Sequence, residues 1–161
     1  MAQHLPMSSH AGCQMRGQSL IVATRPGRPG FRPNYYSYMN TAATLICVVD
    51  DDKSVRESLP DLLREFGFAS KVFATPGDFL EFSSISKTKC LILDIAMPEM
   101  SGPELRLELL KRGHDIPTIF ITAYADFASQ LHQHEGVIGC LTKPFRETAL
   151  LEALKRALRL Q

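Results

Sequence analysis

Five short apolar runs, separated by segments with helical features, constrain what this chain can fold into. The runs occupy residues 45–49, 71–73, 90–93, 117–121 and 137–141. Most are continuous in apolar residues rather than alternating, which is typical of strands buried on both faces. Because strands that alternate with helices are joined by right-handed crossovers, the pattern predicts a parallel sheet with helices on both faces. The expected fold is therefore α/β, with a five-stranded doubly wound sheet.

The segments between the runs carry the signals of helices. Residues 55–66 place apolar side chains on one helix face. Pro76 and Pro103 mark two further helix starts, because proline is favoured in the first turn. A fourth helix, around 126–135, has weak periodicity, and the last is expected over 147–160.

Residues 1–44 differ in composition from the rest of the chain. They contain four arginines and no Asp or Glu, with frequent Pro, Gly, Ser and Gln. This composition predicts a disordered leader before a folded domain at 45–161. Two interpretations of the leader stay open: a transit peptide, or residues upstream of a true start at Met39. We prefer the second.

The net charge of the expected folded domain indicates whether nucleic acid is a suitable partner. The whole chain has 18 Lys and Arg, and the four arginines of the leader leave 14 against 17 Asp and Glu in residues 45–161, a balance of −3. Such a mildly acidic domain is not expected to bind nucleic acid directly.

No apolar run approaches the roughly 20 residues of a membrane span. Cys47, Cys90 and Cys140 lie in apolar runs without the Cys/His spacing of a zinc site, which favours reduced thiols and a cytoplasmic location.

Residues capable of chemistry follow four of the five runs. They are Asp50 and Asp51 after the first, Asp94 after the third, Thr122 after the fourth and Lys143 after the fifth. Ligand sites in such sheets form where the carboxyl ends of the strands meet, so these side chains are expected to lie together.

Three consecutive aspartates, Asp50 to Asp52, repel one another unless a cation, a partner or water offsets their charge. For an isolated triplet, a solvated turn in which Asp52 caps the next helix is the simpler interpretation. Convergence with Asp94 favours a magnesium site, because Mg²⁺ takes hard oxygen ligands and keeps open positions for water and phosphate. Asp94 would then be a carboxylate nucleophile towards phosphorus, with Thr122 and Lys143 near the phosphoryl oxygens.

Four motifs in order resemble the response-regulator receiver domain of two-component signalling, with the nitrogen-fixation regulator type as the nearest match. They are VVDDD at 48–52, LILDIAMPEMSG at 91–102, FITA at 120–123 and TKPF at 142–145. The resemblance covers about Leu45 to Leu160. It implies the flavodoxin-like strand order 2-1-3-4-5 and transfer of a phosphoryl group to Asp94 from a histidine kinase or a histidine phosphotransfer protein.

The resemblance also implies a role for each residue of the pocket. Asp94 is the phosphoacceptor, and Thr122 and Lys143 contact the phosphate. The implied Mg²⁺ ligands are Asp50, Asp51, Asp94 and the backbone carbonyl of Ala96. The implied switch residues are Thr122, Tyr124 and Cys140, of which Cys140 occupies the position where receivers usually have Tyr or Phe. Lys143-Pro144 is expected to be a cis peptide bond.

The expected function is a phosphoacceptor that switches a partner-binding surface, with no enzymatic activity beyond its own phosphorylation and dephosphorylation. An unknown downstream protein and a phosphorylation-dependent dimer are further expectations. The chain is expected to act alone or as the front of a longer product. One alternative is a phosphatase of the haloacid-dehalogenase type, because Asp50-x-Asp52-x-Ser54 resembles the nucleophile loop of those enzymes. The acidic motif that they carry after their lysine is missing here. Another is a degenerate receiver used only for docking.

Overall fold

The computed structural model describes residues 44–124 and 136–160. The leader lies outside the described residues apart from Thr44, and so does the helix expected at 126–135. The disorder of the leader, and with it the division of the chain into a leader and one domain, stays a prediction.

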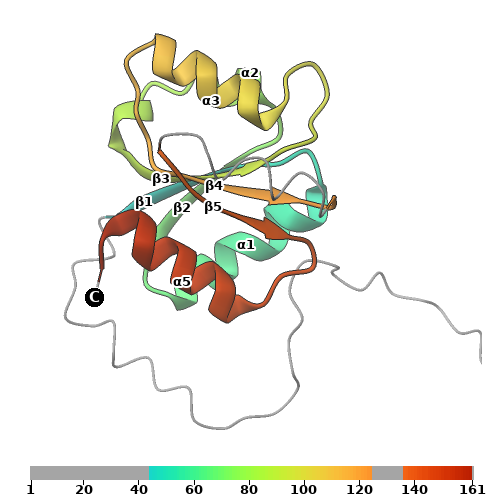
Figure 1. Ribbon diagram of the computed structural model, residues 1–161, viewed down its shortest axis with the longest axis vertical. Coiled ribbons are helices and arrows are strands. Elements are labelled where there is room, and N and C mark those ends of the chain that lie inside the picture. Colours follow the sequence, from blue (N-terminus) through green and yellow to red (C-terminus); the bar gives the residue numbers. More distant parts are fainter. Residues whose placement is uncertain (1–43, 125–135, 161) are drawn as a thin grey trace, which may run out of the picture.

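A sheet of five parallel strands forms the centre of the domain (Figure 1). The strands are β1 (Leu45–Val49), β2 (Ala69–Phe73), β3 (Thr88–Asp94), β4 (Thr118–Thr122) and β5 (Val137–Thr142). Their order is β2-β1-β3-β4-β5, which confirms the predicted order. Both β2 and β3 begin two residues before the predicted start. Backbone pairing with β1 continues there through residues that are not strongly apolar, since Leu45 pairs with both Ala69 and Thr88.

Helices connect the strands. They are α1 (Lys53–Glu65), α2 (Pro76–Leu80), α3 (Gly102–Lys111) and α5 (Glu147–Leu158), with a 3₁₀ turn, η3, at Ile85–Lys87. The side chains of Asp52, Thr75 and Ser101 cap the first three of these helices. Helix α5 ends two residues earlier than expected, because Arg159 adopts a left-handed conformation with φ of 54°.

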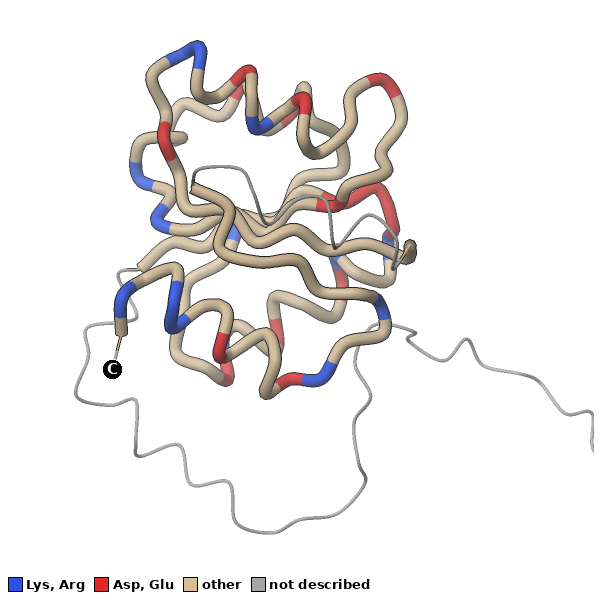
Figure 2. The backbone as a smooth tube through the Cα atoms, viewed as in Figure 1, with Lys and Arg blue, Asp and Glu red and all other residues tan. Residues whose placement is uncertain are grey.

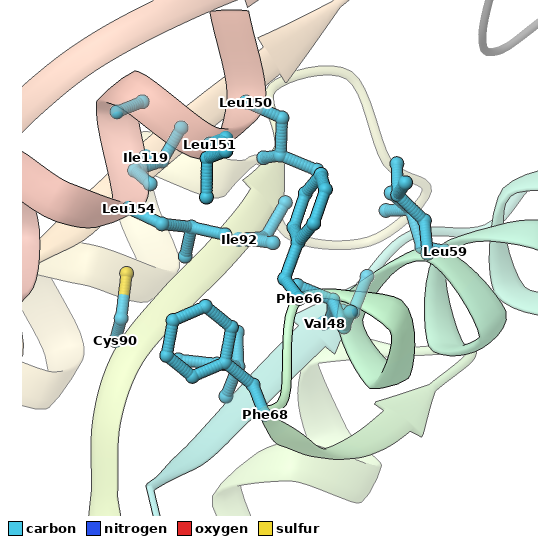
Figure 3. Close-up of a cluster of buried hydrophobic side chains, with 14 of the residues drawn as sticks. Val48, Leu59, Phe66, Phe68, Cys90, Ile92, Ile119, Leu150, Leu151 and Leu154 are labelled. Carbon is cyan, nitrogen blue, oxygen red and sulfur yellow. The ribbon is translucent and has the colours of Figure 1, made fainter. Parts of the chain in front are cut away.

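The helices cover both faces of the sheet: α1 and α5 lie on one side, α2 and α3 on the other (Figure 1). Figure 3 shows the core under α1 and α5. There Val48, Ile92 and Ile119 of three adjacent strands pack with Leu59 of α1 and Leu154 of α5. Each such side chain contributes about 1.5–3 kcal/mol through burial.

Alternate residues of the same strands form a second core under α2 and α3. They include Cys47, Val49, Leu91, Leu93 and Phe120. Burial on both faces explains why most strand sequences are continuous apolar runs, and it confirms the doubly wound α/β class. Cys47 and Cys90 are buried in opposite cores, and the cysteines of the described residues are free thiols.

The carboxyl ends of the parallel strands share one edge of the sheet. Acidic segments, red in Figure 2, gather at the right-hand edge of the domain in this view.

None of the helices within 44–124 and 136–160 combines the length and the apolarity that a membrane crossing requires.

Candidate functional site

Asp50 is the most fully engaged residue of the pocket. It directly follows β1 and is 0% exposed. Its N–H donates to the carbonyl of Phe73 at 3.2 Å, and its carbonyl accepts from Nη1 of Arg56 at 2.8 Å. Its carboxylate accepts from the Asp52 N–H at 2.8 Å and from Nζ of Lys143 at 2.7 Å. Every polar atom of Asp50 therefore has a partner within the protein.

Lys143 brings the carboxylates of two strands together. Its Nζ lies 2.7 Å from Oδ2 of Asp50 and 3.2 Å from Oδ1 of Asp94, the last residue of β3. Its backbone N–H donates to the carbonyl of Thr122 at 2.7 Å, which ties the end of β5 to the end of β4. The Lys143-Pro144 peptide bond is cis, as predicted.

Asp51 completes an acidic group whose geometry suits a metal ion. One carboxylate oxygen from each of Asp50, Asp51 and Asp94 lies within 4.8 Å of the others. Asp51 is exposed, whereas the other two are buried. Three hard oxygen donors with one side open to solvent fit Mg²⁺ better than a closed cage would. Ala96 is exposed in the bend after β3, and its carbonyl as a further ligand stays a prediction.

Asp52 has a different task from its neighbours. Its carboxylate accepts from the N–H of Ser54 at 2.8 Å and caps α1. The capping interpretation is thus correct for Asp52, whereas Asp50 and Asp51 belong to the pocket.

Burial sets the electrostatics of the pocket. Asp94 is 5% exposed, and burial, with the charge of Asp50 adding to it, raises the pKa of Asp94 to about 6 against the opposing effect of Lys143. Burial likewise raises the pKa of Asp50, although the hydrogen bond from Lys143 opposes the shift. Burial alone would lower the pKa of Lys143, but its bonds to both carboxylates outweigh that effect and raise it. The lysine therefore stays protonated while it offsets two buried carboxylates.

The three expected switch residues lie on β4 and β5 or directly after β4. Thr122 is buried at the end of β4, and its Oγ1 accepts from the N–H of Tyr124 at 3.0 Å. Tyr124 is 59% exposed. Cys140 is half-buried on β5, paired with Phe120, and burial raises the pKa of its thiol to about 11, with the charge of Asp94 adding to the shift. The thiol is therefore neutral at physiological pH, and the switching role of all three residues stays a prediction.

Two residues that the sequence analysis did not assign also shape the site. Gly102 begins α3, where a Cβ atom would collide with the carbonyl oxygen of Asp94. Arg56 lies in the first turn of α1 and holds the carbonyl of Asp50. Gly102 is the last residue of the motif LILDIAMPEMSG, whereas a single arginine after three aspartates belongs to no pattern that would indicate its role.

A family model for the response regulator receiver domain matches residues 46–155. Curated relatives agree with this match. Response regulator protein TodT of Pseudomonas putida strain F1 is 39% identical over 124 residues, which is 76% of this chain and 55% of that protein. Transcriptional regulatory protein FixJ of Rhizobium meliloti is 36% identical over 111 residues, covering 68% of this chain and 54% of that protein. The chain spans about half the length of the curated relatives it matches.

Solved structures give the same picture. The response regulator StyR is 42% identical with a TM-score of 0.65, covering 74% of this chain and 61% of that chain. The response regulator TrrA of Thermotoga maritima, solved in complex with Mg²⁺-BeF, is 31% identical with a TM-score of 0.63, covering 71% of this chain and 99% of that chain.

Proposed function

The chain belongs to the response regulator receiver domain family of two-component systems, and from this premise we propose that it accepts a phosphoryl group on Asp94 from a histidine kinase or a histidine phosphotransfer protein. Phosphorylation then changes a surface that a partner protein recognises. The chain acts on no other substrate, so its own phosphorylation and dephosphorylation are its only chemistry.

The observation that carries this proposal is the position of Asp94. Its carboxylate is almost buried, 3.2 Å from a lysine ammonium and close to two further carboxylates that could hold a cation. A buried anion of raised pKa is poorly stabilised in its resting state. Such a group is suited to act as a nucleophile once a cation and the phosphoryl oxygens are in place.

In the transfer step, an oxygen of Asp94 forms a bond to phosphorus while the phosphorus–nitrogen bond to the donor histidine breaks. The electron pair of that bond returns to the imidazole nitrogen. Lys143 bridges Asp50 and Asp94 before the reaction, and its ammonium group then also interacts with the phosphoryl oxygens. The hydroxyl of Thr122 keeps its hydrogen available for the same oxygens, because it accepts from the Tyr124 N–H.

The residues at this edge fit Mg²⁺. Asp50, Asp51 and Asp94 would hold it, with the carbonyl of Ala96 as a further ligand. The metal would neutralise charge on the phosphoryl oxygens during transfer. The TrrA complex with Mg²⁺-BeF supports this assignment by similarity.

The two alternative functions have less support. A phosphatase loop would need Asp52 in the pocket, but its carboxylate caps α1. A receiver that only docks would not need a lysine held between two buried carboxylates. Relatives such as the transcriptional regulatory protein FixJ favour a link to a transcriptional output through a partner or a longer product. A cytoplasmic location, no direct nucleic-acid contact by this domain and a phosphorylation-dependent dimer remain predictions.

The test is to incubate the protein with acetyl phosphate and Mg²⁺ and to locate the acid-labile phosphate by mass spectrometry. Wild type and Asp78→Asn, a control at an exposed aspartate on α2, are expected to gain one phosphoryl group. Asp94→Asn is expected to gain none, because the amide is not a nucleophile towards phosphorus. Labelling of Asp94→Asn to the wild-type extent would refute the assignment of Asp94.

A further inference from the structure

The backbone between β1 and α1 carries Asp51, the one exposed member of the acidic group. Within the described residues, no N–H or O–H group donates to the Asp51 carboxylate, unlike that of Asp50, which has two donors. Where the Asp51 side chain lies therefore depends on the conformation of its own backbone. The groups that hold that backbone are the groups that place this carboxylate.

Arg56 holds the backbone on both sides of Asp51. Its N–H donates to the carbonyl of Asp52 at 3.2 Å, which is the first hydrogen bond of α1. Its guanidinium Nη1 donates to the carbonyl of Asp50 at 2.8 Å. The carbonyl of Asp50 belongs to the same peptide plane as the N–H of Asp51. Fixing that carbonyl therefore fixes the plane from which the Asp51 side chain leaves the chain.

We infer that Arg56 is a positioning residue for the cation site: its side chain sets the orientation of the Asp50–Asp51 peptide and thereby aims the Asp51 carboxylate at the pocket. This inference rests on the proposed function, in which Asp51 is a Mg²⁺ ligand. Groups that orient metal ligands without touching the metal commonly change its affinity by about 10- to 100-fold.

Loss of the Arg56 charge and loss of its hydrogen bond are expected to change the affinity for Mg²⁺ in opposite directions. A guanidinium beside the pocket repels a divalent cation, so its removal should tighten Mg²⁺ binding if charge alone mattered. Loss of orientation has the opposite effect, because Asp51 then samples positions that do not face the other carboxylates. A purely structural arginine would change the melting temperature and leave the affinity for Mg²⁺ unchanged.

The experiment titrates the full chain with MgCl₂ and follows the amide signals of Asp51 and Asp52 by NMR. Arg56→Met keeps an unbranched stem and removes the donor. It is expected to weaken Mg²⁺ binding about tenfold. Arg56→Lys keeps the charge but not the planar fork, and an intermediate loss is expected. The matched control is Arg64→Met on the same helix, where the exposed arginine pairs with Asp61 at 2.8 Å, and wild-type affinity is expected there.

The rate of phosphorylation at different Mg²⁺ concentrations shows whether Arg56 affects Mg²⁺ binding or the phosphoryl-transfer step. With acetyl phosphate as donor, the Mg²⁺ concentration at half-maximal rate should rise in Arg56→Met, while the rate at saturating Mg²⁺ stays within about twofold of wild type. Equal or tighter Mg²⁺ binding in Arg56→Met would overturn the inference, and so would a tenfold loss of rate that saturating Mg²⁺ does not restore. A wild type that binds no Mg²⁺ would instead overturn the proposed function itself.

Discussion

At the scale of single residues, the carboxylate of Asp94 links the chemistry of the pocket to the stability of the fold. Burial raises its pKa to about 6, from an ordinary value of 3.8. The folded state therefore binds a proton at Asp94 more tightly than the unfolded chain does. The stability that comes from this group is fully present below about pH 4 and is lost as the pH rises through about 6.

It follows that Asp94→Asn should stabilise the protein above pH 6 when no metal is bound. A shift of about two pKa units corresponds to about 3 kcal/mol, which is the upper limit of the gain at pH 7.5. The gain should shrink as the pH falls towards 4, because the wild-type carboxyl is then protonated as well. Urea unfolding in EDTA at pH 4.5 and 7.5 measures it, with Asp78→Asn reporting the loss of a surface carboxylate. A gain that grows on acidification would contradict the expected sign.

At the scale of elements, Arg106 links α3 to the residues that precede β4 and β5. Its side chain is buried, and its Nη2 lies 2.7 Å from Oδ1 of Asp115 in the loop before β4. A Cβ atom at Gly136 would collide with the Arg106 guanidinium. Because the guanidinium is buried and paired, it could move away only by disturbing that packing.

Two glycines with similar backbones allow this contact to be measured. Gly113 has φ of +80° with open space around it, whereas Gly136 has φ of +78° and faces Arg106. Gly113→Ala is expected to cost about 1 kcal/mol, from the left-handed conformation alone. Gly136→Ala should cost about 2–3 kcal/mol, because Arg106 must also shift. Equal losses in urea unfolding would show that Arg106 can move away from position 136 without a loss of stability.

The elements also show why part of the site could be predicted from the sequence. An apolar run precedes each of Asp50, Asp94 and Lys143. The topology of a parallel sheet brings the ends of such runs together, independently of the conformation of the loops. Arg56 and Gly102 could not be assigned in this way. One acts through a hydrogen bond to a backbone carbonyl and the other through the absence of a side chain, and neither kind of contact leaves a periodic or compositional pattern.

At the scale of the whole molecule, the described strands and helices supply two cores of buried side chains, whereas the sequence of residues 1–38 has no core-forming pattern. A shortened chain that starts at Met39 is therefore expected to match the full chain in melting temperature and in phosphorylation by acetyl phosphate. Thermal unfolding and mass spectrometry measure the two properties on matched samples. A loss of several degrees, or of labelling, would mean that the leader contributes to the fold.

The bridge made by Lys143 also bears on the order in which the protein is completed on the ribosome. Asp50 leaves the exit tunnel early, and its lysine partner follows 93 residues later. Until β5 emerges, the buried carboxylates of Asp50 and Asp94 have no ammonium group to offset them, so a nascent chain that ends before β5 is held back from closing this edge of the sheet. A truncated product that lacks β5 and Lys143 is therefore expected to lack the ion pairs that hold the carboxylates of Asp50 and Asp94 together.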